Sequence, residues 1–336
     1  MAEISAIVLV GGLGTRLRPV TYTVPKQLIP IAGQCALYHA FDVLPPSVGK
    51  IGLACGYKAE EIELYLKRHP YPTPVEVVRE ETPLGTGGGM KNAERFATDP
   101  FVLLNGDVVS GVDVEAMLSL LEERKAFGVM SLYKVDDTSP YGVAELDPEG
   151  RIQRFVEKPP KDQSPSPWIN AGAGVWRRDV LSAIPAGKVV SFEREIVPDI
   201  LPKGVYGFCF KNWWEDAGTP ERVLNAQRLL FDHPDRRRTP WTTPEGKDVH
   251  PPVAVGKDCQ VVGRKVGPYV TLGDGVILEE GCIVEDSILM DGVRVGKGAM
   301  VVHSILGPGY AVPPETIVEK ECRALENGPA SDWRHP

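Results

Sequence analysis

Two hydrophobic periods divide the chain. Up to about residue 235, short apolar runs typical of buried strands alternate with longer segments of helical spacing. Because a strand, a crossover helix and a second strand give parallel neighbours, this part predicts an α/β layer with a mainly parallel, Rossmann-like sheet. The strand-like runs are 4–10, 51–55, 75–78 and 101–104, and the helical segments are 59–67, 86–96 and 114–125.

A period of six residues governs the last part of the chain. Six residues form one side of a coil in a parallel β-helix, with the apolar positions stacked inside. We therefore expect a small solenoid, whose ends the first domain or another subunit should cover. The series are Val266, Leu272, Leu278 and Val284; Val270, Val276, Cys282 and Ile288; and, after a slip of one residue, Val295 and Val301 with Val293, Ala299 and Ile305.

A proline-rich stretch without apolar period separates these two parts. It contains the arginine run 236–238, which we expect to be solvated. The predicted organisation is an α/β domain over 1–235, a linker over 236–252, and a β-helix with its tail over 253–336.

Composition limits the partners. The 336 residues are 43% hydrophobic, which suits two domains with ordinary cores. With 37 Lys and Arg against 45 Asp and Glu, the net charge of -8 argues against a nucleic-acid surface, because phosphate-backbone binding needs a broad basic face. Phosphates, if bound, must be met by local charges and a metal.

The sequence shows no targeting or membrane signal. The first residues lack a basic segment and a cleavage site, and no apolar run could cross a bilayer, so we expect a cytoplasmic protein with no membrane partner. The six cysteines form no CxxC pair, which favours reduced, mostly buried thiols over a zinc site.

A glycine turn follows the first strand. Glycines let backbone N–H groups approach an anion closely, and the hydroxyl, guanidinium and ammonium groups that follow can add donors. Neither a Walker loop nor a dinucleotide turn fits, because Leu17 stands at the third glycine position of the latter. The residues of this turn are Gly11, Gly12, Gly14, Thr15, Arg16 and Arg18, with Lys26 after it.

The compound pattern GGLGTRLRP followed by PKQLIP resembles the sugar-1-phosphate nucleotidyltransferases. This resemblance, which covers nearly all of the first 230 residues, implies transfer of a nucleotidyl group from a nucleoside triphosphate to a hexose 1-phosphate, with release of pyrophosphate. The hexads resemble the left-handed β-helix found behind the catalytic domain in several of these enzymes. The implied catalytic residues are Arg16, Lys26 and Asp107, and the implied nucleotide-binding residues are Leu9, Gly11, Gly12, Gly14, Thr15, Glu80 and Gly85.

Two aspartates are candidate ligands for Mg²⁺. Asp107 follows a buried strand and a glycine, and Asp216 precedes Gly-Thr-Pro at the start of a predicted helix. An aspartate after glycine is also a common turn residue. A magnesium site nevertheless commonly takes two hard oxygen ligands from the protein and further ligands from substrate phosphates. The resemblance implies that Asp107 and Asp216 both have this role.

Three further elements resemble the family's sugar-binding segments. They are Tyr141-Gly142-Val143, Glu157-Lys158-Pro159 and Asn170-Ala171-Gly172, the last placed before a strand that ends at Trp176. Glu157 can accept from two adjacent hydroxyls, Lys158 can neutralise the sugar phosphate, and the Asn170 amide can both donate and accept. Without the resemblance, an exposed salt bridge between the first two side chains would be the simpler interpretation.

Glu80 is the candidate reader of the base. It precedes an Leu-Gly-Thr loop that resembles the family's base-reading segment and is unusually rich in glycine at 87–89. A carboxylate only accepts hydrogen bonds, and guanine presents two adjacent donors, so GTP is favoured, with mannose 1-phosphate as the family's commonest partner for guanylyl transfer. Thymidylyl or uridylyl transfer to glucose 1-phosphate remains the alternative if Glu81 or the backbone reads the base.

Two other classes stay open. The chain could be a catalytically inactive sensor of sugar nucleotides. Its sequence nevertheless retains the charged residues that the resemblance makes functional, which are Arg16, Lys26, Asp107, Lys158 and Asp216. The solenoid could be an acyltransferase, but its one histidine, His303, is expected to be a surface residue. The expected partners are a nucleoside triphosphate, a sugar 1-phosphate and further copies of the chain in a homo-oligomer.

Overall fold

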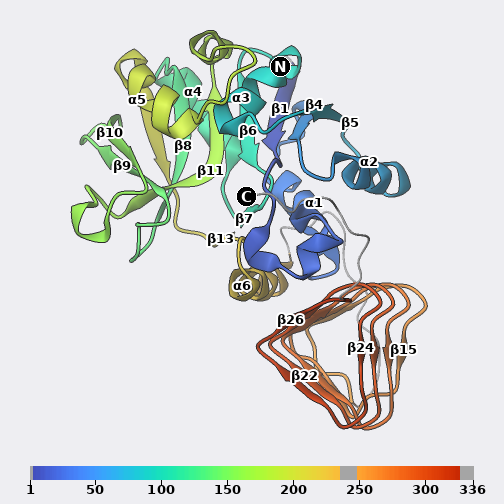
Figure 1. The fold of residues 1–336 in the computed structure, drawn as a ribbon. Helices are drawn as coiled ribbons and strands as arrows, with labels where there is room; N and C mark the ends of the chain where they lie inside the picture. The colour runs from blue at the N-terminus through green and yellow to red at the C-terminus, as the bar shows by residue number, and fades with distance from the viewer. Residues whose placement is uncertain (1–2, 235–247, 326–336) are drawn as a thin grey trace. The chain divides into compact units, whose positions relative to one another are not determined.

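The computed structural model describes residues 3–234 and 248–325. The chain forms two compact units (Figure 1). The first joins the N-terminal segment up to Gly12 with Val43–Trp214, and the second joins Leu13–Asp42 with the chain from Glu215 onward. Residues 236–247 of the expected linker, which include the arginine run, and the tail from 326 lie outside the described residues.

A nine-stranded mixed sheet forms the centre of the first unit. Strand β1 lies between β6 and β4 and is parallel to both, and β4 is parallel to β5. Strand β11 is antiparallel to β6 and β8, while β8 and β12 are parallel. The strands are β1 (Ile4–Leu9), β4 (Val48–Cys55), β5 (Val75–Arg79), β6 (Phe101–Asn105), β8 (Gly128–Lys134), β9 (Gly142–Leu146), β10 (Ile152–Glu157), β11 (Trp168–Trp176) and β12 (Val205–Cys209). Strand β7 (Val108–Ser110) follows β6 in the chain but is not part of this sheet.

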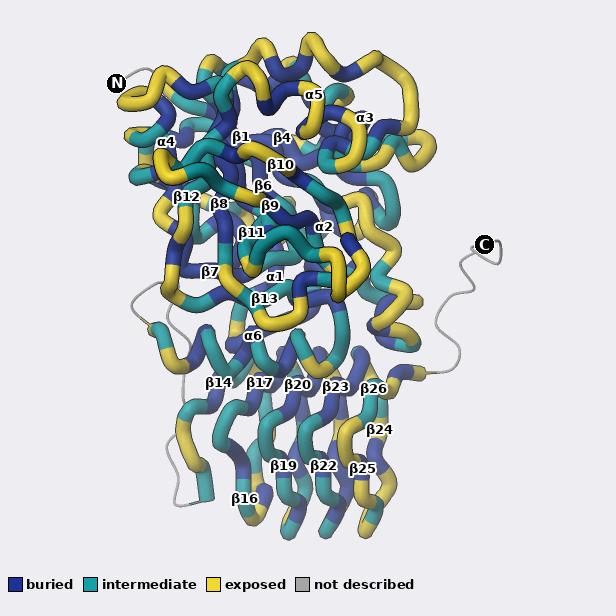
Figure 2. The backbone as a smooth tube through the Cα atoms, turned by 90° about the vertical axis from the view of Figure 1, so that its left-hand side faces the viewer, coloured by how far each residue is buried: buried dark blue, intermediate teal, exposed yellow. Residues whose placement is uncertain are grey.

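Helices pack against this sheet and bury its central strands (Figure 2). The predicted strands and the helices at 59–67 and 114–125 are confirmed, but the segment 86–96 splits into an α-helix and a 3-10 turn, Glu94–Phe96. The helices of this unit are α2 (Ala59–Arg68), α3 (Gly85–Asn92), α4 (Val114–Glu123) and α5 (Val197–Ile200).

The second unit contains a parallel β-helix, as the hexads predicted. Its three sheets pair strands of successive coils in parallel, with partners 17 residues apart, as for Val253 with Val270 and Ile305 with Cys322. All predicted inward positions are buried, and all except Ile288 and Ile305 belong to the core inside the coils. Those two align with Thr271, whose hydroxyl bonds Gln227 outside the coils, so they face outward and the prediction was wrong for them. The strands are β14 (Val253–Val255), β15 (Gln260–Val261), β16 (Lys265–Val266), β17 (Val270–Leu272), β18 (Ile277–Leu278), β19 (Ile283–Glu285), β20 (Ser287–Leu289), β21 (Arg294–Val295), β22 (Met300–Val302), β23 (Ile305–Leu306), β24 (Ala311–Val312), β25 (Ile317–Glu319) and β26 (Cys322–Arg323).

The rest of the second unit comes from the first domain of the sequence. It includes the hairpin β2 (Pro30–Ile31) and β3 (Gln34–Cys35), helix α1 (Ala36–Phe41), the end of β13 (Trp214–Asp216) and helix α6 (Pro220–Asp232). Helix α6 lies along one side of the β-helix and contacts several successive coils, so a lateral face of the solenoid is covered (Figure 2).

Candidate active site

The glycine turn begins at the carboxyl end of β1, beside the end of β6. Leu9 pairs with Asn105, and the Gly106 N–H donates to the Leu9 carbonyl over 2.9 Å. Carboxyl ends of adjacent parallel strands share one edge of the sheet, which is where ligands of such sheets bind. The loop that carries Asp107 therefore lies beside Gly11 and Gly12, the part of the glycine turn within this unit.

Glu80 projects into a space bounded by glycines. A Cβ atom built on Gly89 would lie 2.5 Å from its Oε1, and one on Gly56 or Gly11 would lie 3.7 or 4.0 Å from its Oε2. The Leu84 N–H donates to Oε2 over 3.2 Å. Burial raises the pKa of Glu80, and the hydrogen bond from Leu84 partly opposes this rise. Because residues 11, 56 and 89 are glycines, they place no side chain against this carboxylate, which faces the start of the glycine turn.

The unusual glycines of α3 are explained by close backbone packing. Gly85 adopts a φ of +71°, and the N–H of Gly87 donates to the Val190 carbonyl over 2.9 Å. A Cβ on Gly88 would lie 2.6 Å from the Lys188 carbonyl oxygen. Three consecutive glycines disfavour a helix, so these tertiary contacts, and not helix propensity, hold α3 in place.

The expected sugar-binding residues Gly142 and Glu157 are direct neighbours. They pair across the β9–β10 hairpin, and a Cβ on Gly142 would lie 2.7 Å from Glu157 Oε2. Burial, followed by the charge of Glu193, raises the pKa of Glu157. Lys158 adopts a left-handed φ of +52° and its Nζ lies 3.7 Å from Glu157 Oε1, so the backbone turns sharply at this ion pair.

Asn170 lies inside β11 and not before it, which corrects the expected start of this strand. The pairing with β8 is irregular between Asn170 and Gly174, where Gly172 has a φ of +83°. An irregularity of this kind re-aims side chains, and glycine permits it. Asn170 and Gly172 line a pocket together with Asn105, Trp176 and Glu193.

Glu193 is a candidate site residue that the sequence did not reveal. It belongs to a π-helical turn, Phe192–Ile196, a rare conformation that often marks functional sites. The Thr86 hydroxyl donates to its Oε2 over 2.5 Å, and Thr86 lies in the first turn of α3. Glu193 therefore connects the loop after Glu80 with the pocket that Asn170 lines.

The second unit carries the rest of the glycine turn. Gly14 has a φ of +63°, and a Cβ there would lie 2.9 Å from Thr21 Cγ2 and 3.3 Å from Lys26 Cβ. Lys26 thus packs back against the turn, as its position in the sequence predicted. Thr15 and Arg16 are exposed, which leaves their donors accessible to a ligand.

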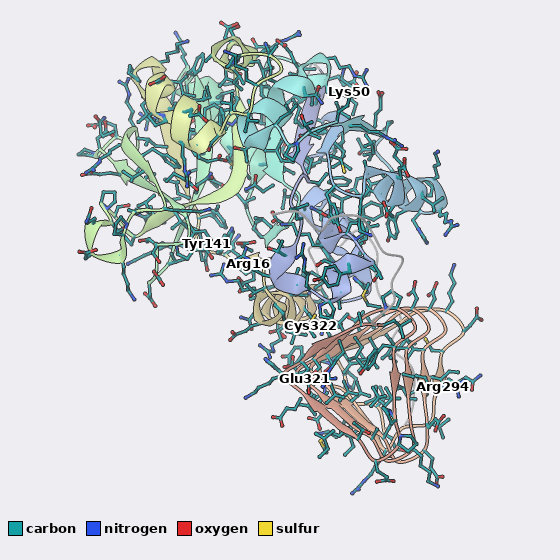
Figure 3. All side chains as sticks on the ribbon, viewed as in Figure 1. Arg16, Lys50, Tyr141, Arg294, Glu321 and Cys322 are labelled. Carbon is teal, nitrogen blue, oxygen red and sulfur yellow. The ribbon has the colours of Figure 1, made fainter. Side chains whose placement is uncertain are left out.

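Arg16 and Asp216 meet at the backbone of Gly218. A Cβ on this glycine would lie 2.6 Å from Arg16 Nη2 and 3.1 Å from Asp216 Oδ1. Arg16 is seen beside the start of α6 in Figure 3. Asp216 Oδ2 also lies 3.4 Å from Arg222 Nη1, in the first turn of that helix. The geometry brings a candidate phosphate-binding guanidinium to a candidate metal ligand.

The two candidate metal ligands, Asp107 and Asp216, are of a type that suits a hard cation. Within residues 3–234 and 248–325, no cluster of three or more His, Cys, Asp or Glu side chains could enclose a metal ion. Asp107 and Asp216 offer only carboxylate oxygens, which are the ligands that Mg²⁺ prefers, and magnesium sites commonly take the remaining ligands from substrate phosphates and water. Each carboxylate therefore offers a ligand of the kind that Mg²⁺ accepts.

The candidate residues divide between the two units. The first holds Leu9, Gly11, Gly12, Glu80, Gly85, Asp107, Gly142, Glu157, Lys158 and Asn170, and the second holds Gly14, Thr15, Arg16, Lys26 and Asp216. None of the six cysteines forms a disulfide, and Cys209 is exposed. No helix of the described chain is long and apolar enough to span a membrane.

Most of this chain is similar in sequence to known proteins. Residues 5–233 match the nucleotidyl transferase family, and residues 246–326 match the GMPPB C-terminal domain family. A mannose-1-phosphate guanylyltransferase of Mycobacterium tuberculosis is 35% identical over 312 residues, which cover 89% of this chain and 83% of that protein. Mannose-1-phosphate guanylyltransferase 1 of Arabidopsis thaliana is 32% identical and covers 90% and 85% of the two chains.

A similar solved structure is HddC from Yersinia pseudotuberculosis, complexed with GMP-PN. Its TM-score is 0.58 at 29% identity, and the match covers 68% of this chain and 99% of HddC.

Proposed function

The chain belongs to the nucleotidyl transferase family, and we propose that it transfers a guanylyl group from GTP to mannose 1-phosphate, with Mg²⁺ as cofactor and pyrophosphate as the second product. Relatives that carry the name mannose-1-phosphate guanylyltransferase match most of this chain, including its C-terminal part. These likenesses support the reaction class, and the choice of base rests on the site itself.

The half-buried carboxylate of Glu80 carries the proposal for guanine. Guanine offers two adjacent donors, N1–H and the 2-amino group, which one carboxylate can accept with both oxygens. Glu81, the other candidate reader, is exposed, whereas Glu80 faces the glycine turn. Since a buried polar group left without a partner costs about 1 to 3 kcal/mol, a base without these donors should bind at least about ten-fold more weakly.

Positioning and charge neutralisation then account for catalysis. An oxygen of the sugar phosphate attacks the α-phosphorus in line and pyrophosphate leaves. A phosphate monoester has a second pKa near ~6 and is already anionic at neutral pH, so the attack needs no protein base. Arg16 and the amides of the turn would hold the triphosphate, and Lys26 would stabilise the charge on the phosphates. Mg²⁺, held by Asp107 and Asp216, would offset negative charge where the two substrates meet.

The sugar would be held by the residues around the β9–β10 hairpin and the β11 irregularity. Glu157, with its oxygen against the Gly142 backbone, can accept from neighbouring hydroxyls, and Asn170 and Glu193 add polar atoms from the adjoining pocket. Lys158, which is more exposed than Glu157, would meet the sugar phosphate. Cytoplasmic localisation, the homo-oligomer and the domain limits drawn from the sequence stay predictions.

A matched pair of variants tests the proposed base. We expect wild-type protein to prefer GTP over dTTP in kcat/KM by about ten-fold or more, and Glu80→Gln to reduce this ratio, because an amide presents a donor as well as an acceptor. Glu81→Gln removes the same charge from the next, exposed residue and should leave the ratio unchanged. A wild-type preference for dTTP, or a ratio untouched by Glu80→Gln, would refute the role of Glu80.

A further inference from the structure

The three corners of the β-helix use different residues for the same backbone turn. Each corner places one residue per coil at a left-handed φ, where glycine is the least strained choice. Two corners are mainly glycine, and other residues, Asp258 and Glu315, occur only in their end coils. The third corner never uses glycine; its residues, which we call the corner ladder, are Tyr269, Asp286, His303 and Lys320, with φ between 44° and 57°.

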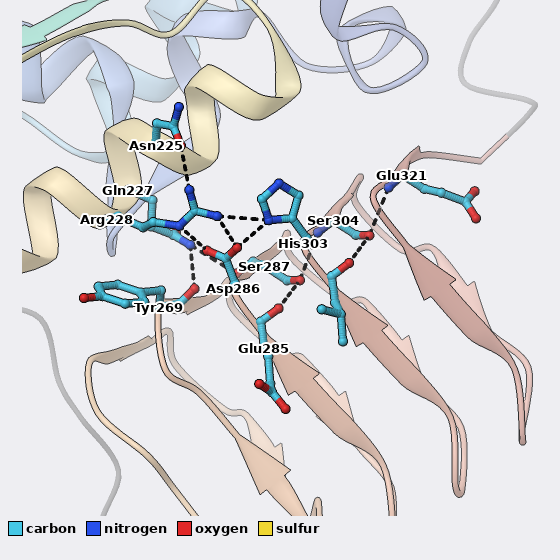
Figure 4. A network of polar contacts seen from close by, with 11 residues as sticks. Asn225, Gln227, Arg228, Tyr269, Glu285, Asp286, Ser287, His303, Ser304 and Glu321 are labelled. Carbon is cyan, nitrogen blue, oxygen red and sulfur yellow. Dashed lines mark hydrogen bonds and ion pairs between the residues drawn. The ribbon is translucent and has the colours of Figure 1, made fainter.

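Side chains of the corner ladder bind helix α6 (Figure 4). Arg228 of α6 forms a forked ion pair with Asp286, in which its Nε lies 2.9 Å from Oδ1 and its Nη2 contacts Oδ2. His303 Nδ1 lies 2.5 Å from the same Oδ2, and the Tyr269 hydroxyl donates to Asp232 over 3.0 Å. His303 is 26% exposed, so it lies partly at the surface, and its ring contacts Asp286 and Arg228.

A buried amide fixes the same helix to the same corner. Gln227 is fully buried; its Nε2 donates to the Tyr269 carbonyl over 2.8 Å, and its Oε1 accepts from the Thr271 hydroxyl over 2.6 Å. The Ala32 N–H also donates to Oε1, over 3.4 Å. Since both ends of a buried amide are used, a shift of α6 along the solenoid would break several hydrogen bonds at once.

The other end of α6 reaches the candidate active site. Thr219 caps the helix by accepting from the Arg222 N–H, and Arg222 also contacts Asp216. Arg16 lies against Gly218 in the same turn. A second contact reaches the glycine turn from the last coil, where the Cys322 thiol lies 3.5 Å from the Leu17 carbonyl.

We propose that Asp286 of the corner ladder is a positioning residue for the nucleotidyl transfer, acting through Arg228 and α6 on Asp216 and Arg16. A side chain in the left-handed region strains the backbone, and glycine serves that position at the other corners, so the ladder keeps side chains where they hold α6. The inference rests on the proposed function, in which Asp216 is a metal ligand and Arg16 binds phosphates. It gives the β-helix a role in the reaction besides packing.

Asp286→Gly separates this role from the stability of the solenoid. Glycine adopts the left-handed corner without strain but removes the carboxylate that Arg228 binds. We expect kcat to fall by about ten-fold or more and the Mg²⁺ concentration for half-maximal rate to rise, because small displacements of reacting groups cost rate steeply. The GTP to dTTP ratio should not change, since Glu80 belongs to the other unit.

Asp258→Gly is the matched control. Like Asp286→Gly, it replaces an aspartate that has a left-handed φ, here 56°, with glycine. The later residues at this corner are glycines, and Asp258 is exposed. It should leave kcat and the Mg²⁺ requirement as in the wild type. Arg228→Lys keeps the charge but loses the forked geometry, so an intermediate loss of kcat is expected.

Hydrogen exchange provides a readout that does not depend on activity. Amides at 216–222 should exchange faster in Asp286→Gly than in the wild type and the Asp258→Gly control. Wild-type exchange at 216–222, or equal effects of the two glycine variants, would overturn the inference even if the wild type is active. Absence of turnover in the wild type would instead refute the proposed function, and the exchange comparison would still decide whether the ladder positions α6.

Discussion

Gly89→Ala tests the base site without altering Glu80. The added Cβ would lie 2.5 Å from Glu80 Oε1, closer than real Cβ contacts, so the carboxylate must move. Its hydrogen bond from the Leu84 N–H already spans 3.2 Å, and a displacement of about 0.7 Å would lengthen it beyond useful range. Loss of one or both hydrogen bonds to guanine, at about 1 to 3 kcal/mol each, predicts a fall of about ten-fold or more in kcat/KM for GTP.

The assay compares kcat/KM for GTP and for dTTP, together with the melting temperature. Alanine favours a helix over glycine by about 1 kcal/mol, and the obstructing atom is the end of a flexible side chain, so the fold should survive. Gly56→Ala is the control, because its Cβ would meet the same carboxylate at 3.7 Å, an ordinary contact. An unchanged GTP to dTTP ratio in folded Gly89→Ala would show that the position of Glu80 does not determine base choice.

Three further predictions concern the metal, the sugar site and the solenoid. Asp107→Asn and Asp216→Asn should each lower kcat by about two orders of magnitude with little change in melting temperature, and wild-type turnover at saturating Mg²⁺ would exclude the metal role. The pKa of Glu157 is higher in the folded protein than the ordinary pKa of glutamate. The stability of the fold therefore decreases as the pH rises from the ordinary pKa through the raised one. Glu157→Gln should therefore melt higher than wild type at pH 7 but not below about pH 4, while KM for the sugar phosphate rises; equal melting at both pH values would contradict this. Truncation after about residue 235 removes the partners of buried Gln227, so the melting temperature should fall, and light scattering should show an altered oligomer; unchanged values would refute a supporting role of the solenoid.

Much of the fold follows from local periodicity. The strands at the sheet centre and most inward positions of the β-helix were predictable, because burial on both faces or at a fixed period leaves a direct pattern in the sequence. Leu289 and Leu306 are inward where Ile288 and Ile305 were expected, because adjacent apolar residues do not show which of them faces the core. The split of segment 86–96 was not predictable, since apolar spacing does not distinguish a continuous helix from a helix followed by a 3-10 turn. One side of each 17-residue coil has five residues instead of six, as between Gly281 and Asp286. The six-residue pattern in the sequence therefore slips by one residue.

The candidate site was only partly readable. The glycine turn and Lys26 follow from local spacing, and the structure places Lys26 against Gly14. Glu80 was proposed from the resemblance of its loop to the family's base-reading segment, and the structure places it near Gly11. Glu193 was missed because its contact with Thr86 joins residues far apart in sequence. The ladder at Asp286 was also missed, although its signal was present: a side chain recurs at a corner where a glycine would be less strained.

Pyrophosphate release by the wild-type protein tests the central claim most directly. Four nucleoside triphosphates should be combined with a set of hexose 1-phosphates, including those of mannose and glucose, with Mg²⁺ present. The proposed function predicts the highest kcat/KM for GTP with mannose 1-phosphate, at least about ten-fold above dTTP with the same sugar. Release with no combination, or a clear preference for dTTP or UTP with glucose 1-phosphate, would contradict it.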